Sequence, residues 1–492
     1  MAARPIITRQ PNERLRYLVH EAGCSNAGLA RRVNIVGAEH GLDLRYDKTS
    51  VARWLRGQQP RGRTPAMVAE ALGRKMGRPV TVEEIGMSDS RRLSAAIGLG
   101  YAAGPAEAVD QARRLWRGDV SRQPFLSEAP PLAAVLVEPS RDWLIGEAAP
   151  RPGQAARSGQ AATAALHPPR PPAGLRPAPP GRGDVPAVRM ATDRLVTLDR
   201  RHGSALIRPI AVHYLDSVVG PLLGGVREEA GERTTARELY AAAARLTELA
   251  GSMAVDAGRP ALALRYYIQA LRLAEAGGDR GLGGYVLCAG MSRLAAVLGS
   301  PREARQLART ALEGTRDRVG SRALALFHAT EARAAAAAGD AAGCQEAAGR
   351  ALAAMERAEA RTGPEPVWIA HFDRAYLADE LAHCHRDLGQ PAAAARRAQE
   401  ALAGHPPGRV RRRAIDLALL ASAQAEQREI ERACGTGLQA VELLGDLGSA
   451  RATAYVAELA QLLRPHSEAS AVREFQERLA GIGTSPAAAG SR

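Results

Sequence analysis

The chain has 492 residues, which is too long for one hydrophobic core, so two or three domains are expected. Aromatic residues make up only 4% of it and alanine is abundant, which favours close helix packing and argues against stacking of single-stranded bases. The net charge is +14. Lysine occurs at only two positions, so arginine supplies almost all cations; this preference for arginine is general in the chain and is not by itself evidence of function. We expect an all-α protein.

Cellular location follows from what the sequence lacks. The five cysteines are scattered and show no paired spacing, as in reduced cytoplasmic proteins. No apolar run approaches the roughly 18 residues of a membrane span. The N-terminus has no hydrophobic signal core. We expect a cytoplasmic protein without membrane contact.

Four amphipathic helices are predicted near the N-terminus. They cover 11–22, 25–41, 47–57 and a stretch from residue 64, and each combines apolar residues at helical spacing with a cap or a glycine stop. A short element at 80–85 follows them. Residues 1–90 are thus expected to form one small helical domain.

The third of these helices has an apolar back and a polar front. Asp47 is a good N-cap, while Val51, Trp54 and Leu55 form one buried stripe. Such a helix, with cations and hydroxyls outward, suits a DNA major groove, because cations can contact phosphates and polar side chains can hydrogen-bond to base edges. The arginines of the loop that follows are expected to contact phosphates. The candidate DNA-binding residues are Lys48, Thr49, Ser50, Arg53, Arg56, Arg61 and Arg63.

The N-terminal layout resembles the Cro/C1-type (XRE-like) helix-turn-helix family. The resemblance rests on Leu-Ala-Arg-Arg-Val (29–33), Thr-Ser-Val-Ala-Arg-Trp-Leu-Arg-Gly (49–57) and Met-Val-Ala-Glu-Ala-Leu-Gly (67–73). The pattern from 9–15 to 81–87 is similar to actinobacterial differentiation and secondary-metabolism regulators. The family has a tight turn where this chain inserts Asn34 to Tyr46, which either lengthens the second helix or adds a loop.

The charge distribution favours DNA over a structural bundle with a solvated face. Residues 1–92 contain 17 Lys and Arg against 9 Asp and Glu, whereas 191–492 contain 38 against 35. More than half of the net charge therefore lies in the first fifth of the chain. This is the footprint expected of a module that binds phosphates.

Two segments of different character follow. Residues 91–147 are expected to be a helical connector, with a helix at 91–118 and a short apolar island at 132–137. About a third of residues 148–190 are Pro or Gly, which is typical of disordered tracts. We expect a disordered linker there, and another disordered segment at 483–492.

From residue 191 to 482 the sequence predicts repeated helical hairpins. Five segments have small or apolar residues at the same offsets, and the first residues of successive segments lie 41, 40, 50 and 39 positions apart. In most of them a glycine ends one helix, a proline opens the next and alanines recur at fixed offsets. The segments begin at Gly258, Gly299, Gly339, Gly389 and Arg428.

These segments resemble the tetratricopeptide repeat, whose second helix carries a similar Gly, Ala, Tyr and Ala spacing. An irregular alanine-rich bundle is the alternative. The resemblance implies a helical solenoid with an inner groove, and a row of cations beside an aromatic there suits an acidic peptide or carboxylate, or is a solvated face. The implied groove residues are Arg245, Arg293, Arg333, Tyr376, His383 and Arg386.

Signatures of catalysis are absent from the sequence. It contains no Gly-rich phosphate loop, zinc-protease helix, nucleophile elbow or kinase motif. His383, Cys384 and His385 are adjacent, so on a helix they cannot converge on one ion. We expect no enzyme, no catalytic residue, no metal and no cofactor.

The sequence therefore predicts a DNA-binding transcriptional regulator whose repeat domain senses a partner or ligand. The expected partners are double-stranded DNA, a protein or peptide in the repeat groove, and a second copy of the chain. The alternative is a scaffold that acts through protein–protein binding and does not read DNA sequence.

Overall fold

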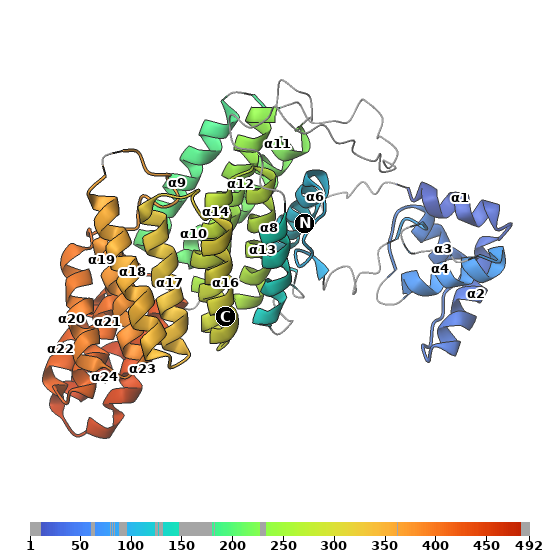
Figure 1. The fold of residues 1–492 in the computed structure, drawn as a ribbon. Helices are drawn as coiled ribbons and strands as arrows, with labels where there is room; N and C mark the ends of the chain where they lie inside the picture. The colour runs from blue at the N-terminus through green and yellow to red at the C-terminus, as the bar shows by residue number, and fades with distance from the viewer. Residues whose placement is uncertain are drawn as a thin grey trace, which may run out of the picture. The chain divides into compact units, whose positions relative to one another are not determined.

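The computed structural model describes residues 11–60, 64–78, 80, 82, 84–87, 96–123, 126, 131–146, 180–181, 183–226, 233–361 and 363–483. The chain divides into two compact units, residues 1–97 (unit 1) and 98–492 (unit 2). Helices account for the regular structure of the described residues, which contain no strand (Figure 1). The all-α prediction is confirmed.

In the described part of unit 1, four helices surround one apolar core. Leu15, Leu29, Val51, Trp54 and Leu72 are almost completely buried in it. The described residues between 77 and 87 are turns and irregular backbone, and the side chain of Asn12 ties this segment to the first helix through a 2.9 Å bond to the Ile85 carbonyl. The helices are α1 (Glu13–Glu21), α2 (Asn26–Glu39), α3 (Lys48–Leu55) and α4 (Thr64–Met76).

The insertion between the second and third helices is both a longer helix and a loop. Helix α2 continues to Glu39, and an irregular segment then leads to α3. Asn34 pins that segment to α2, since its side chain accepts from the Tyr46 amide and donates to the Tyr46 carbonyl, both at 2.9 Å. The Tyr46 ring contacts Trp54 edge-on at 5.0 Å. The loop therefore fixes where α3 begins.

Unit 2 begins with residues that the sequence assigned to a connector. The predicted helix at 91–118 is interrupted, because Gly98 adopts a positive φ of 75° and α6 (Pro105–Val120) starts only at a proline that favours a first helical turn. Helix α6 packs on α13 (Pro260–Ala276), as does α8 (Val137–Ile145), which follows a short 3₁₀ turn, η1 (Ala133–Leu136). The apolar island at 132–137 thus forms η1 and the start of α8. Leu136 of the island and Trp143 of α8 are fully buried.

The predicted linker ends earlier than residue 190. Helix α9 (Asp184–His202) already includes residues 184–190, because Val185 and Val188 are buried in unit 2 and hold the first turns of this helix. Residues 147–179, most of the predicted linker, lie outside the described residues, as do 484–492 of the predicted tail.

One helical stretch, Ser204–Gly224, has the length and hydropathy of a membrane span, a feature that the sequence analysis did not expect. It consists of α10 (Ser204–Tyr214), a π-helical stretch η3 (Leu215–Val219) and α11 (Gly220–Gly224). Buried side chains such as Ile207, Val212 and Leu223 pack it within unit 2, where it contacts α6, α9 and α12. Its apolar residues thus contribute to the hydrophobic core of unit 2.

Helical hairpins in succession form the rest of unit 2 (Figure 1). Adjacent helices pack in pairs, and successive pairs lie side by side. The elements are α12 (Arg233–Asp256), α13, α14 (Arg280–Tyr285), η4 (Val286–Ser292, π-helical), α15 (Arg293–Val297), α16 (Pro301–Gly314), α17 (Ser321–Ala337), α18 (Ala341–Glu359), α19 (Arg374–Asp387), α20 (Pro391–Gly404), α21 (Val410–Glu426), α22 (Ile430–Leu444), α23 (Ala450–Leu463), η5 (Arg464–His466, 3₁₀) and α24 (Ser470–Gly483).

The repeated sequence pattern marks equivalent positions in these hairpins. All five first residues, four glycines and Arg428, have positive φ between 62° and 73° and follow the first helix of a hairpin. The alanines twelve positions further on are fully buried, as small residues at close helix contacts should be. That expectation is confirmed for Ala270, Ala311, Ala351, Ala401 and Ala440.

Arg428 is the one member of this set with a Cβ in the left-handed region. Its φ is 62° and its side chain is exposed. Arg428→Gly should raise the free energy of unfolding by up to about 1 kcal/mol, because relief of the Cβ contact exceeds the added freedom of glycine in the unfolded chain. The reverse change, Gly389→Arg at a φ of 65°, should lower it. Denaturant unfolding of both variants measures this, and a loss of stability in Arg428→Gly would contradict it.

The first and last parts of the hairpin series are joined. Helix α9 contacts α21, and α12 contacts α23. Backbone bonds link His202 and Ala205 to Gly448, at 3.0 and 3.1 Å. We call this arrangement the closed array, because helices from both parts of unit 2 meet around a shared interior.

Candidate functional site

A pocket of about 120 Å³ lies inside the closed array. Its lining comes from α9, α12, α13, α14, η4, α15, α19, α21 and α23, and from the loop before α19. Arginines outnumber carboxylates in this lining by seven to two. The arginines are Arg200, Arg245, Arg293, Arg409, Arg411, Arg412 and Arg451, and the carboxylates are Asp199 and Glu248.

Six of these arginines have carboxylate partners in the wall or behind it. Arg293 donates to Glu380 at 2.6 Å and Arg409 to Asp373 at 2.7 Å. Arg245 pairs with Glu248, and Arg412 contacts Asp379. Arg411 bridges Asp199 and Asp256, and Arg451 lies 3.8 Å from Asp256. These pairs keep buried guanidiniums in fixed positions, since each unpaired charge would be costly.

Arg200 differs from the other six. Its side chain makes no hydrogen bond or ion pair with any residue that the structure describes, although it is half-buried in the pocket wall. Burial lowers the pKa of its guanidinium, and the nearby charges of Arg245 and Arg409 lower it further. Arg200 is therefore a positively charged side chain close to other guanidiniums and without a carboxylate partner among the described residues.

Two neutral groups report the positive potential of the pocket. Burial and then the charges of Arg200, Arg245 and Arg412 hold the pKa of His371 well below its usual value. Burial by itself would raise the pKa of Tyr376, but Arg293 and Arg412 outweigh it and lower that pKa to about 8. A buried phenol ionises this easily only where cations surround it.

The ionisation of Tyr376 can be observed directly. Arg293 Nη1 donates to its hydroxyl at 3.0 Å, and the Arg412 guanidinium lies 3.5 Å from its ring centroid. We expect one tyrosine to ionise with a midpoint near pH 8, below the ordinary pKa of about 10. Tyrosinate absorbance against pH measures this step, which Tyr376→Phe should remove. A parent protein without ionisation below pH 9 would contradict the potential inferred for the pocket.

Aromatic and aliphatic side chains complete the wall. Tyr285 lies 6.1 Å from His371 between ring centroids and carries the Arg245 guanidinium at 5.4 Å. Tyr267 approaches η4 closely because residue 290 is glycine: an added Cβ would lie 2.7 Å from the ring. Leu294 and Val297, one turn apart on α15, give the pocket an apolar side.

The structure separates the six groove residues implied by the repeat resemblance. Arg245, Arg293 and Tyr376 line the pocket. Arg333 and His383 do not; Arg333 is paired with Glu380 at 3.2 Å, and His383 is buried against Asp379 and Tyr455. Arg386 lines a separate hollow together with Glu458. Arg333 and His383 are held outside the pocket by contacts between helices, whereas Arg386 lies at another hollow.

Much of the pocket was missed by reasoning from the sequence. Arg409, Arg411 and Arg412 are a visible basic cluster that could have been noticed. His371 lies in the long connection that makes one repeat interval 50 residues instead of about 40, which is also a usable signal. No local pattern identifies Arg200, because it reaches the pocket only when α9 packs against α21.

One buried trio within the described residues could hold a metal ion. Ligand atoms of Asp379, His405 and Asp416 lie within 4.8 Å of one another. Arg412 already contacts Asp379, Arg409 Nη1 donates to His405 Nδ1 at 3.2 Å, and burial raises the pKa of Asp416 to about 8. A divalent cation would have to enter beside two guanidiniums. The trio is therefore better described as acidic and imidazole groups compensated by arginines.

The polar front of α3 in unit 1 is partly as predicted by the sequence. Lys48, Thr49, Arg53 and Arg56 are exposed. Ser50 is a correction: its amide and hydroxyl both donate to the Asp47 carboxylate, at 2.8 and 2.9 Å, and it is 6% exposed. It lies one turn before Trp54 and therefore faces the core side of the helix. Predicted contacts from Arg61 and Arg63 fall on residues outside the described ones.

The fold thus defines an all-α protein with a small N-terminal helical unit and a closed array of helical hairpins. Residues 15–88 match the family model of the SP15 N-terminal domain. The match starts in α1 and ends shortly after α4, so it covers unit 1 and no part of the array. A comparison with curated proteins finds no match.

Proposed function

We propose that this protein is a DNA-binding transcriptional regulator. Unit 1 is a helix-turn-helix module of the Cro/C1 type that inserts α3 into the major groove of double-stranded DNA. Unit 2 is a tetratricopeptide-like domain that senses a ligand or partner. The protein acts in the cytoplasm and performs no catalysis.

The observation that carries this proposal is the outer face of α3. Lys48, Thr49 and Arg53 are exposed on a short helix whose Asp47 cap leaves its first turn accessible. Val51 and Trp54 anchor the opposite face in the core, so the outward side chains are held on a rigid element. Cations supply phosphate contacts, and threonine and arginine can hydrogen-bond to base edges.

The experiment is selection of duplexes from a random pool by the full-length chain. A regulator should enrich one sequence motif, and binding should fall steeply as salt increases, because phosphate contacts release counterions. Lys48→Ala should weaken binding to the enriched duplex, while Lys75→Ala, on α4, serves as a charge-matched control.

A scaffold that acts through unit 2 is the alternative. It predicts that no motif is enriched and that Lys48→Ala and Lys75→Ala behave alike. That outcome would overturn the proposed function without bearing on what the pocket of unit 2 binds.

A further inference from the structure

The pocket of unit 2 offers one cation without a counterion and an apolar wall beside it. Arg200 has no partner among the described residues, while Leu294 and Val297 line the same pocket. We propose that this pocket binds a small organic anion whose acidic group is held at Arg200 and whose apolar part packs against α15. As a statement about regulation, the inference rests on the proposed function, in which unit 2 is the sensing unit.

The arrangement of charges favours an anion. Arg245 and Arg409 face Arg200 from α12 and from the start of α21, and each already has its own carboxylate. The closest acid on α9, Asp199, is bound by Arg411 at 2.7 Å. An anion at Arg200 would thus remove a repulsion between guanidiniums and add charge-assisted hydrogen bonds, which arginine forms well with carboxylates and phosphates.

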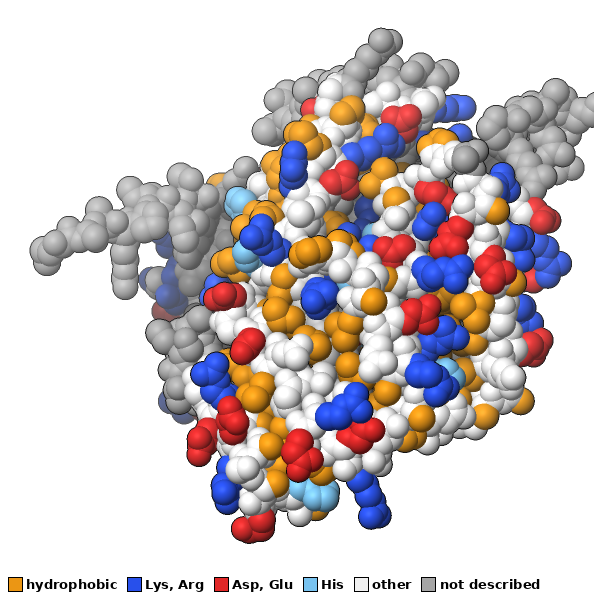
Figure 2. All heavy atoms as spheres, turned by 90° about the vertical axis from the view of Figure 1, so that its left-hand side faces the viewer, with side chains coloured by type: hydrophobic (Ala, Val, Ile, Leu, Met, Phe, Trp, Pro, Cys, Tyr) orange, Lys and Arg blue, Asp and Glu red, His pale blue; other side chains and the backbone are white. Residues whose placement is uncertain are grey.

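The outer surface of unit 2 does not have this character. On the face that Figure 2 shows, arginine side chains are interleaved with Asp and Glu side chains. Exposed pairs such as Arg350 with Glu346 and Arg432 with Glu429 are of this mixed kind. The face in Figure 2 thus carries mixed charge, whereas the lining of the pocket is mostly cationic.

The apolar wall and the closure of the array define the size of the ligand. Val297 lines the pocket and is 65% exposed to solvent, whereas Leu294, one turn before it, is buried in the pocket wall. The pocket volume of about 120 Å³ suits an acidic group with one ring or a short chain. Contacts of α21 with α9 and of α23 with α12 close the interior, so an extended peptide has no open groove to follow.

Calorimetric titration of the full-length protein tests this with defined probes. Phenyl phosphate and benzoate carry an anion on a ring and separate a phosphate from a carboxylate preference. Inorganic phosphate lacks the ring, and phenol lacks the charge. We expect one of the two ring anions to bind about tenfold or more tightly than either inorganic phosphate or phenol.

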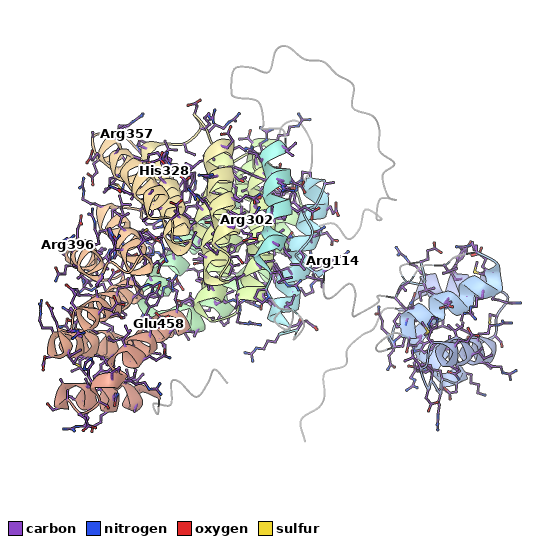
Figure 3. All side chains as sticks on the ribbon, turned by 60° about the horizontal axis from the view of Figure 1, so that its bottom comes forward. Arg114, Arg302, His328, Arg357, Arg396 and Glu458 are labelled. Carbon is purple, nitrogen blue, oxygen red and sulfur yellow. The ribbon has the colours of Figure 1, made fainter. Side chains whose placement is uncertain are left out.

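Arg200→Gln provides the decisive variant. It removes the unpaired cation without breaking any bond between described residues, so the protein should fold and its melting temperature should stay equal or rise. Affinity for the preferred ring anion should fall about tenfold or more, as for loss of a charge-assisted bond. The matched control is Arg302→Gln, an exposed arginine on α16, labelled in Figure 3, which should bind as the parent does.

The ionisation of Tyr376 gives a second readout. A bound anion counteracts the surrounding guanidiniums, so the midpoint of tyrosinate formation should move upward from about 8 when the probe saturates the parent protein. Arg302→Gln should show the same movement, whereas Arg200→Gln should show it only at much higher probe concentration.

Three results would overturn the inference. The first is parent protein that binds neither ring anion, and the second is equal affinity in the parent and in Arg200→Gln. The third is polyglutamate binding more tightly than both ring anions, which would indicate an acidic peptide. Since none of these measurements includes DNA, they separate failure of the anion site from failure of DNA binding by unit 1.

Discussion

Replacing Arg53 with alanine should weaken binding to the preferred duplex by about 1–3 kcal/mol and leave binding to scrambled DNA almost unchanged. Arg53 is exposed on α3, and among the described residues its side chain makes one long bond, 3.3 Å from Nη2 to Ser50 Oγ. Its guanidinium is thus free to make a bidentate contact with guanine, which is the contact that carries sequence information. Titrations against both duplexes at several salt concentrations measure the difference.

Arg61→Ala is the control for this experiment. Sequence reasoning assigns Arg61 to a phosphate, so its loss should weaken both duplexes equally and reduce the log–log salt slope by about one. If Arg53→Ala binds both duplexes as the parent does, α3 is not the reading helix and the scaffold alternative is favoured.

Arg411→Ala should have the largest effect on stability, a loss of about 3–5 kcal/mol in the free energy of unfolding of unit 2. Arg411 donates to Asp199 at 2.7 Å and to Asp256 at 3.2 Å; both carboxylates are buried, and the Arg411 side chain is 12% exposed. Its removal leaves two carboxylates without their main cation. Ser204 and Ser449 bond to the same carboxylates and cannot replace the charge.

Thermal and denaturant unfolding of the full-length variant measure this loss. Arg302→Ala, on the surface, should change stability by less than about 0.5 kcal/mol. Arg411→Ala with a stability similar to that control would mean that the pairs at Arg411 contribute little to unit 2.

The sequence predicted those features that depend on neighbours in the chain. The cap at Asp47, the stripe of Val51 and Trp54, and the recurring alanines follow from helical spacing, and the structure contains them. The prediction for Ser50 was wrong. Ser50 lies four residues before Trp54 and is therefore on the core side of the helix, where its hydroxyl is satisfied by Asp47.

Features that depend on distant parts of the chain were not predicted. Arg411 and Asp199 are 212 residues apart, and their contact requires every hairpin between them to have the observed curvature. The same holds for Arg200, which Arg409 approaches from a distant part of unit 2. A pocket assembled in this way leaves no motif, whereas a capped helix does.

The backbone hydrogen bond between His202 and Gly448 affects how unit 2 can unfold. In an open stack of hairpins, a terminal pair loses only one interface when it melts, so fraying proceeds inward in small steps. Here α9 and α23 each have neighbours on two sides, and neither can detach until the seam at Gly448 and Arg411 has opened. Unit 2 should therefore resist partial melting and then unfold in one sharp, cooperative transition. A ligand in the interior would strengthen that seam from both sides at once.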